Sequence, residues 1–383
     1  MAVRFDKHEL AGAFGDIGTD LPLLIAMIAA VPLDAASVCI VFGALQIASG
    51  LLYGIPMPVQ PLKAMAAIML TAKLSPGTLA GGGLVVGATM LILAASGALD
   101  WLARVVKKEV VRGIQLGLGI SLATIALKDY VSRDGARGYA LAGAAVVVLL
   151  GLSRQKRVPA PLVVMMLGAL YALVFQLHDV GTSQLVGLTL PQLVTPSRDE
   201  LVAGALVLAL PQIALSLGNS VIATSQSSRD LFPERPASVR KIGMTYGLMN
   251  LIAPWFGGVP VCHGCGGLVG FYGFGARTGG APIIYGAFYL LLGLVFAPGF
   301  DVVVRVFPLP VLGVVLLFES VLLMTFVSDV ASDRRALWVT FAVAAAVVGL
   351  PNGYFIGLAA GSAIVWLVRR GWLKTPTDTA LDA

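Results

Sequence analysis

The sequence reads PMPVQPLK at residues 56–63 and VPVCHGCGG at residues 259–267, two proline-led breaks inside strongly apolar sequence. Pro58 and Pro260 stand 202 positions apart. Proline lacks a backbone donor and disfavours helix at the residue before it, so each break is expected to be a short extended segment that runs into a helix. Interrupted hydrophobic segments at corresponding places in two halves of a membrane chain indicate a carrier's binding site.

The composition excludes an ordinary soluble domain. Hydrophobic residues make up 58% of the 383 residues and charged residues only 12%, whereas soluble domains carry about 25% charged residues. Apolar runs long enough to cross a bilayer recur throughout, which predicts an all-α polytopic membrane protein. The formal net charge of +6 does not indicate a nucleic-acid partner. The distribution of the basic residues along the chain instead bears on the membrane topology. The polar start, Met1–His8, predicts no cleavable signal peptide.

Fourteen transmembrane segments are expected, seven in each half of the chain. Segments 3 and 10, which begin at Pro61 and Gly264, are too short to span, because a span needs about 20 helical residues. We therefore expect them to be discontinuous half-helices. The expected division is a first repeat at 1–176, a connecting loop at 177–200, a second repeat at 201–370 and a short cytoplasmic tail at 371–383.

The two halves also resemble each other in sequence. FGD at 14–16 matches LGN at 217–219 with an offset of 203, and FGALQ at 42–46 matches YGLMN at 246–250 with an offset of 204. Nearly equal offsets in the same order indicate an internal repeat. Because seven crossings is an odd number, the second unit is expected to lie upside down relative to the first, as a 7+7 inverted repeat.

Basic residues predict the orientation. With the N-terminus in the cytoplasm, 19 of the 26 Lys and Arg residues fall on the cytoplasmic side and Lys63 lies within the membrane. The positive-inside rule then predicts cytoplasmic N- and C-termini. The six basic residues expected on the opposite side are Lys73, Lys128, Arg133, Arg137, Arg198 and Arg305.

The two half-helices predict an anion site. Each helix N-terminus offers free amide groups and about half a positive charge, and inverted symmetry would point the two ends at each other. Lys63 would add about one more positive charge, which together nearly balances a tetrahedral dianion. The candidate binding residues are the glycines Gly264, Gly266 and Gly267, which admit close approach to the backbone, and the donors Gln60, Ser216, Asn219 and Ser220.

Ionisable residues inside a membrane are functional by default. Asp16 and Glu319 are the first candidates to carry a coupling proton, and Asp20 and His263 are further ones. The alternatives are that Asp16 only caps its helix, that Glu319 pairs structurally with a neighbouring helix, and that Lys63 turns to the interface or pairs with an acid.

The sequence motifs give little support for an enzyme or for a metal site. Cys262 and Cys265 form a CxxC, but only His263 is nearby as a further ligand, so we expect no metal site and no cofactor. The chain has no P-loop, no HExxH and no serine-elbow motif, which argues against an enzyme.

Four stretches together resemble the molybdate transporters related to the sulfate permeases: FGDIGTDLP at 14–22, PMPVQPLKAMAA at 56–67, LGNSVIATS at 217–225 and VPVCHGCGGLVGFYGFGARTGG at 259–280. The resemblance covers nearly the whole chain. It implies the fourteen-helix architecture shared with the uracil permease, with segments 1–4 and 8–11 in a core domain and segments 5–7 and 12–14 in a gate domain. It also implies high-affinity molybdate uptake coupled to protons. The corresponding location is a bacterial inner (cytoplasmic) membrane.

The resemblance also implies which positions form the site. The signatures contain Asp16, Thr19, Gln60, Lys63, Asn219, Ser220, His263, Gly264, Gly266 and Gly267. Cys265, which we include among the binding residues, stands where the family is expected to carry a smaller residue such as alanine. The alternatives are a transporter of sulfate or another oxyanion such as tungstate, and an anion channel. A homodimer is a further expectation.

Overall fold

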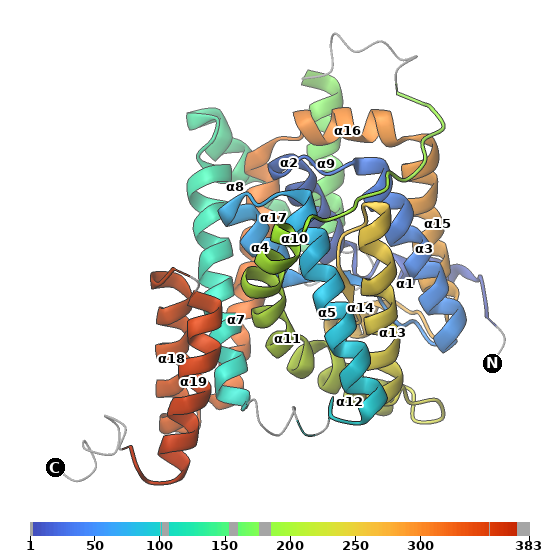
Figure 1. The fold of residues 1–383 in the computed structure, drawn as a ribbon. Helices are drawn as coiled ribbons and strands as arrows, with labels where there is room; N and C mark the ends of the chain where they lie inside the picture. Colours follow the sequence, from blue (N-terminus) through green and yellow to red (C-terminus); the bar gives the residue numbers. More distant parts are fainter. Residues whose placement is uncertain are drawn as a thin grey trace.

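The computed structural model describes residues 3–99, 101, 107–152, 160–175, 185–351 and 353–373. Apart from two short strands, the described elements are helices (Figure 1). The expected all-helical class is therefore confirmed. Residues 177–184 of the expected connecting loop and 374–383 of the expected tail lie outside the described residues.

The first half contains a run of helices interrupted at the first proline-led break. Its elements are α1 (Lys7–Ala13), α2 (Ile17–Ala30), α3 (Ala35–Tyr53), β1 (Gln60–Pro61), α4 (Lys63–Ala72), α5 (Pro76–Ser96), α7 (Lys108–Ile125), the π-helical η1 (Ala126–Val131), α8 (Gly135–Leu152) and α9 (Ala160–Phe175).

The second half is interrupted at the second break. Its elements are α10 (Arg198–Ala203), η3 (Gly204–Ala209), α11 (Leu210–Ser216), η4 (Leu217–Ile222), α12 (Ala223–Leu231), α13 (Val239–Ile252), η5 (Ala253–Phe256), β2 (Val261–Cys262), α14 (Cys265–Gly273), α15 (Gly280–Val295), α16 (Ala297–Val306), α17 (Leu309–Thr325), η6 (Phe326–Val330), α18 (Arg334–Gly349) and α19 (Gly353–Arg369).

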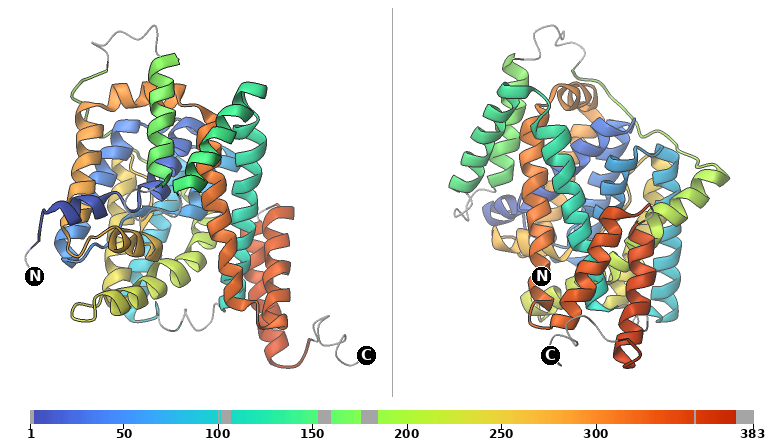
Figure 2. Two further views of the ribbon diagram at one scale, coloured as in Figure 1. Left: turned by 180° about the vertical axis from the view of Figure 1, so that it is seen from behind. Right: turned by 90° about the vertical axis from the view of Figure 1, so that its left-hand side faces the viewer.

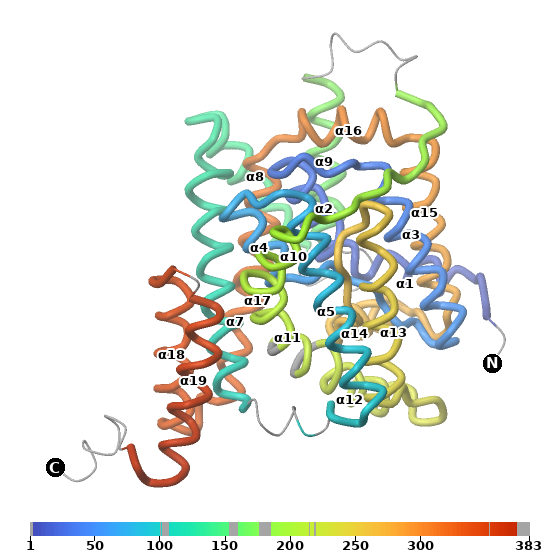
Figure 3. Tube along the Cα trace, in the orientation of Figure 1, coloured from blue at the N-terminus to red at the C-terminus, as the bar shows by residue number. Residues whose placement is uncertain are grey.

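The helix that opens the second half departs from the α-helical hydrogen-bond pattern in two places. Residues 198–231 are helical without a gap, but η3 and η4 are π-helical. A capping box starts it, in which Ser197 and Glu200 each accept from the other's backbone N–H. Figure 3 traces α10, α11 and α12 one after another towards the lower end of the molecule. Short π-helical stretches often mark functional positions, and η4 contains the expected binding residue Ser220.

By length and apolar composition, five described helices can cross a membrane, or up to seven if each of two bent helix pairs is one span. Three further apolar helices among the described residues are shorter than this criterion requires: Lys63–Ala72, Ala160–Phe175 and Gly353–Arg369. The expected count of fourteen is not confirmed by this criterion and stays a prediction. One reason is that the continuous helical stretch 198–231 is divided among several short elements, each too short to be counted as a span.

Close helix contacts are made at glycines. A Cβ on Gly43 of α3 would lie 2.6 Å from the carbonyl oxygen of Gly286 on α15, and a Cβ on Gly113 of α7 would lie 2.5 Å from the Val343 Cβ on α18. Small residues allow backbones to approach in membrane helices. The helices form two groups, α7, α8, α17, α18 and α19 in one and α3, α5, α13 and α15 in the other. The two groups can be followed in Figure 1 and from behind in the left view of Figure 2.

The two breaks are held by equivalent amide side chains. Gln46 of α3 donates to the Val59 carbonyl (2.8 Å) and accepts from the Val59 amide (3.2 Å). Asn250 of α13 donates to the Val261 carbonyl (2.6 Å) and accepts from the Val261 amide (2.8 Å). Each side chain therefore pairs with both the backbone N–H and the backbone C=O of one buried valine in a non-helical segment. Buried backbone groups need such hydrogen-bond partners.

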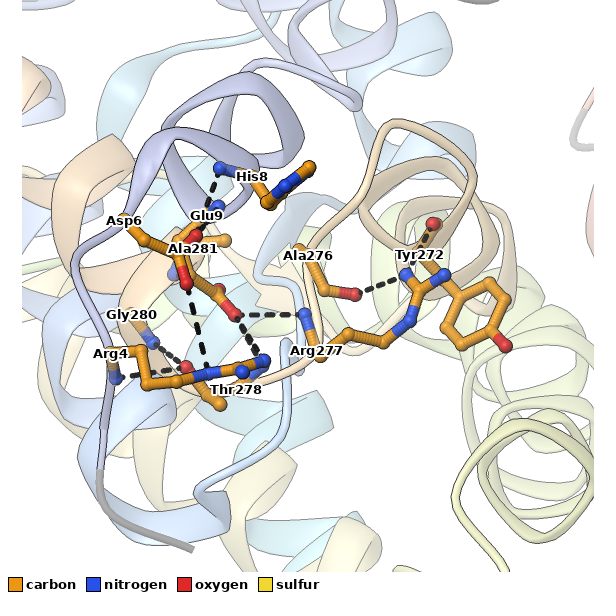
Figure 4. Close-up of polar contacts among 10 residues, drawn as sticks. All are labelled: Arg4, Asp6, His8, Glu9, Tyr272, Ala276, Arg277, Thr278, Gly280 and Ala281. Atoms are coloured by element: carbon orange, nitrogen blue, oxygen red, sulfur yellow. Dashed lines mark hydrogen bonds and ion pairs between the residues drawn. The ribbon is translucent and has the colours of Figure 1, made fainter.

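The N-terminal helix is fixed by a buried carboxylate (Figure 4). Glu9 accepts from the backbone amides of Arg277 (2.9 Å), Thr278 (2.9 Å) and Ala281 (3.1 Å), and the Arg4 guanidinium lies 3.8 Å away. A carboxylate at the first turn of α15 is favourable because it meets free amides and the positive end of the helix dipole. These bonds tie α1 to the loop that follows α14.

Candidate functional site

The starts of α4 and α14 are brought together by the pairing of the two breaks. Strands β1 and β2 pair antiparallel, with Gln60 opposite Cys262 and Pro61 opposite Val261. The amide of Leu62 extends the pairing by donating to the Pro260 carbonyl (3.0 Å). Because α4 begins directly after β1 and α14 shortly after β2, both helix N-termini lie beside this two-stranded pair.

A carboxylate–amide pair occupies the space beside α14. Gln60 donates its side-chain N–H groups to both carboxylate oxygens of Asp16, at 2.7 Å each. A Cβ on Gly264 would lie 1.6 Å from Gln60 Oε1, and a Cβ on Gly267 would lie 2.3 Å from Asp16 Oδ2. These glycines therefore make room for Gln60 and Asp16. A Cβ on Gly266, in contrast, would meet nothing within 4 Å, so this glycine faces open space.

An ion pair joins three helices at the start of α4. Lys63 Nζ lies 3.6 Å from Glu319 Oε2, and Thr19 donates to Glu319 Oε1 at 3.2 Å. The side chains of Lys63 and Glu319 are only 21% and 13% exposed. Three of the residues singled out in the sequence thus meet, from α2, α4 and α17. In this arrangement the Lys63 charge is already balanced by Glu319.

The first amides of α4 have a protein partner. Gln212 Oε1 accepts from the backbone amides of Ala64 (3.1 Å) and Met65 (3.2 Å). Its own N–H donates to Ser216 Oγ (2.9 Å), which lies 2.8 Å from the Tyr246 hydroxyl. Ser216 therefore positions Gln212. The sequence analysis missed Gln212, and the available signal was a single amide after Pro211 in an apolar run.

His263 joins the two breaks. It is fully buried, with Nδ1 2.8 Å from the Pro58 carbonyl oxygen and Nε2 2.8 Å from Thr245 Oγ1. Its own carbonyl accepts from Thr224 (2.7 Å). Both ring nitrogens thus have protein partners. Cys265 is half-buried at the first position of α14, and the side chain of Asn219 lies outside the described residues.

A small pocket with several polar side chains in its lining lies between these elements. Its polar lining comes from Gln60, Lys63, Gln115, Gln212, Ser220 and Cys262, and its volume is about 10 Å³. That is room for about one water molecule. The pocket therefore brings together three of the expected binding residues, Gln60, Lys63 and Ser220.

Gln115 of α7 is the second residue that the sequence analysis missed. It is fully buried and lines this pocket, its Oε1 accepts from Arg112 (2.7 Å), and its Nε2 has no hydrogen-bond partner among the described residues. Most buried polar groups in proteins are paired. An unpaired donor facing a pocket beside Lys63 is suited to an anionic guest.

Comparison with known proteins now gives the family. The sequence profile described as "Molybdate transporter of MFS superfamily" matches residues 8–122 and 204–323, which include both breaks. The chain belongs to the molybdate transporter family. Molybdate transporter 2 of Arabidopsis thaliana is 33% identical over 95% of this chain and 87% of its own length. Molybdate transporter 1 of Chlamydomonas reinhardtii is 29% identical over 93% of this chain and 91% of its own length.

Solved structures support the fold of this family member. The transmembrane domain of the cyanobacterial bicarbonate transporter BicA superposes with a TM-score of 0.67, covering 94% of this chain and 98% of that one at 18% identity. Murine Solute Carrier 26 family member A9, an anion transporter in the inward-facing state, superposes with a TM-score of 0.68 at 13% sequence identity. The match covers 98% of this chain and 70% of that one. The chain is thus an integral membrane protein with a sulfate-permease-like fold, and its relatives are transporters, not enzymes.

Proposed function

We propose that this protein imports molybdate by secondary active transport and binds it between the N-termini of α4 and α14. Relatives of about 30% identity along nearly the whole chain support the substrate. The observation that carries the site is the antiparallel pairing of β1 with β2, which sets two helix starts side by side. Helix N-termini bind anions through free amides and the positive end of the dipole.

The binding residues would come from several elements. In the closed pocket, Lys63, Gln60, Ser220 and Gln115 are in place to surround a dianion, and Gly266 leaves α14 backbone accessible. Gln212 would have to release the Ala64 and Met65 amides for them to bind oxygen. We retain Thr19 beside Glu319, together with Ser216, Asn219, His263, Gly264, Cys265 and Gly267, as candidate site residues, of which Thr19 and Ser216 act through their neighbours.

Opening of the pocket requires one helix group to move against the other. A volume of about 10 Å³ is too small for a tetrahedral oxyanion. We propose a 7+7 inverted repeat, with 1–176 and 201–370 as the two units and α4 and α14 as the half-helices. The matching roles of Gln46 and Asn250 support the repeat. Gln115 of α7 would then be a gate residue that completes a site built by the core.

Proton coupling is proposed at the ion pair. With Glu319 ionised, Lys63 has a partner and gives little net attraction to an anion. A proton on Glu319 would free the ammonium for molybdate, so that proton and anion enter together. Asp16, bonded to Gln60, is the other candidate proton carrier. Placing a dianion beside these carboxyl groups calls for neutralisation of at least one of them, because like charges at short range disfavour joint ionisation.

The orientation remains a proposal based on the charge count. Cytoplasmic N- and C-termini follow from the 19 to 6 distribution of basic residues. The relatives named above are from a plant and an alga, so a bacterial inner membrane stays a prediction. Homodimerisation stays a prediction as well.

Uptake by the purified protein in proteoliposomes tests the proposal. We expect saturable molybdate uptake that rises when the outside is made acidic, and only weak inhibition by a large excess of sulfate. Tungstate should compete, being a tetrahedral dianion of similar size. Equal potency of sulfate would favour the broader oxyanion transporter, and large unitary currents would favour a channel.

A further inference from the structure

A large cavity in the described part of the chain is separate from the proposed binding pocket. It has a volume of about 960 Å³ and lies between the C-terminal ends of α2 and α4, the π-helical η1, helix α16 and the start of α17. In Figure 1, α16 lies at the upper end of the molecule, opposite α12. The cavity therefore lies at one end of the helix bundle.

Its lining is rich in cationic side chains. Four basic residues line it, Lys73, Lys128, Arg133 and Arg305, against two acidic ones, Asp129 and Asp301, a formal balance of +2. Arg305 donates to Asp301 at 2.7 Å, so this pair is neutral overall. For Lys73, Lys128 and Arg133, no side-chain ion pair or hydrogen bond is found among the described residues.

These residues are also unusual in where they occur in the sequence. They are four of the six basic residues expected on the side with few positive charges. The positive-inside rule disfavours basic residues there, yet four of them gather around one cavity. All six are exposed, and the other two, Arg137 and Arg198, do not line the cavity.

The cavity and the proposed pocket are linked by one short helix. Lys63, which lines the pocket, is the first residue of α4, and Lys73, which lines the cavity, is the C-cap of the same helix. Ten helical residues at 1.5 Å per residue separate the two places by about 15 Å. An anion held in the cavity is therefore one half-helix away from the pocket.

We propose that this cavity is an anion-collecting vestibule, which attracts hydrated divalent oxyanions and supplies them to the pocket at the start of α4. The role of the cavity in supplying the pocket rests on the proposed anion transport. The attraction of anions into the cavity does not depend on that transport. A volume of this size is too large to grip one oxyanion by direct contacts, so the charges act through their summed field. Clefts lined by one sign of charge concentrate oppositely charged solutes and speed their association, and salt weakens this effect.

A cysteine placed in the cavity measures that field without any transport. Ser132 lines the cavity and is half-buried. In Ser132→Cys, we would compare the reaction rates of a sulfonate-bearing and a trimethylammonium-bearing methanethiosulfonate reagent. The parent chain corrects for Cys39, Cys262 and Cys265. We expect the anionic reagent to react about tenfold faster at low ionic strength, with the preference falling as salt is added.

Charge-neutral variants then locate the effect. Lys128→Gln combined with Arg133→Gln should lower the preference for the anionic reagent about threefold to tenfold, whereas Arg137→Gln, on the same side but outside the cavity, should leave it unchanged. Molybdate and sulfate should both slow the anionic reagent. Equal rates for the two reagents, or an equal effect of Arg137→Gln, would overturn the vestibule.

Uptake separates this inference from the proposed function. If the vestibule supplies the pocket, the Lys128→Gln/Arg133→Gln variant should raise the KM for molybdate at low ionic strength by about threefold to tenfold and leave kcat unchanged. An unchanged KM in a chain that transports molybdate contradicts the vestibule alone. Absence of uptake by the unaltered chain contradicts the proposed function, while the cysteine reactivities still decide whether the cavity attracts anions.

Discussion

Gln46 and Asn250 stand 204 residues apart and make the same pair of hydrogen bonds, each to the backbone N–H and C=O of one valine in a proline-led break. The valines, Val59 and Val261, precede the expected half-helices in their respective halves. Both amide side chains are fully buried. The repeat in the sequence is thus matched by a repeated structural role at the two breaks.

Loss of either amide should therefore destabilise the protein to a similar degree. Gln46→Leu and Asn250→Leu each leave a buried backbone donor and acceptor unpaired, which costs about 1–3 kcal/mol per group. Thermal unfolding in detergent measures this, with exposed Met244→Leu on α13 as the control. A large effect of one variant and none of the other would contradict equivalent roles.

The ion pair between Lys63 and Glu319 should separate binding from coupling. Glu319→Gln cannot exchange a proton, so uptake should lose its dependence on the pH gradient while molybdate still binds. Lys63→Gln removes the nearest positive charge and should weaken binding about tenfold or more. Titration calorimetry with molybdate and uptake at several external pH values give the two readouts. Asp230→Asn, an exposed carboxyl, should change neither. If uptake by Glu319→Gln still depended on the pH gradient, Glu319 would not be the proton carrier and Asp16 would be the remaining candidate.

The three glycines at the start of α14 should differ in their response to alanine. In Gly264→Ala and Gly267→Ala the new Cβ displaces Gln60 or Asp16 and breaks their hydrogen bonds, so both uptake and thermal stability should fall. Gly266→Ala meets open space, so stability should be kept and molybdate affinity should fall if an oxyanion approaches there. Gly273→Ala, at the far end of the same helix and also unobstructed, is the control. Unchanged affinity in Gly266→Ala would remove this backbone from the site.

Gln115 should show opposite effects on stability and on binding. Its Nε2 is buried without a partner among the described residues, so Gln115→Leu removes a costly unpaired donor and should leave unfolding unchanged or shift it upward. Arg112, which donates to Gln115, keeps its contact with Asp329. Molybdate affinity should nevertheless fall about tenfold, because a hydrogen bond to a charged group is lost. Ser121→Ala on α7 serves as the control. Undiminished affinity would assign Gln115 to packing alone.

Much of this arrangement could be predicted from local sequence because proline and glycine act on the backbone directly. Residues 56–62 and 259–264 of the two breaks are non-helical and lead into short helices, as their prolines indicate. The amides at 46 and 250 lie within the repeated motifs, although their shared task appears only in the fold. Lys63 and Glu319 were recognisable as charges within apolar sequence, but their pairing is a tertiary contact that spacing does not determine.

The roles of Gln115, Gln212 and the glycines could not be predicted in the same way. A single amide in an apolar helix has no periodic signal, and its partner is set by packing. A glycine indicates that a side chain would not fit, but not what fills the space. At Gly264 and Gly267 the occupants are Gln60 and Asp16, whereas Gly266 is the position left open. The sequence analysis likewise did not predict the π-helical stretches η3 and η4.

The central claim is that two adjoining helix N-termini hold a dianion, and tungstate tests it most directly because its heavy atom can be located by anomalous diffraction. In a crystal structure with tungstate, we predict one strong peak between the N-termini of α4 and α14, within contact distance of Lys63 and Ser220, in a pocket wider than the present 10 Å³. A structure in which these helix ends stay closed or separate, with tungsten only at other places, would contradict the account.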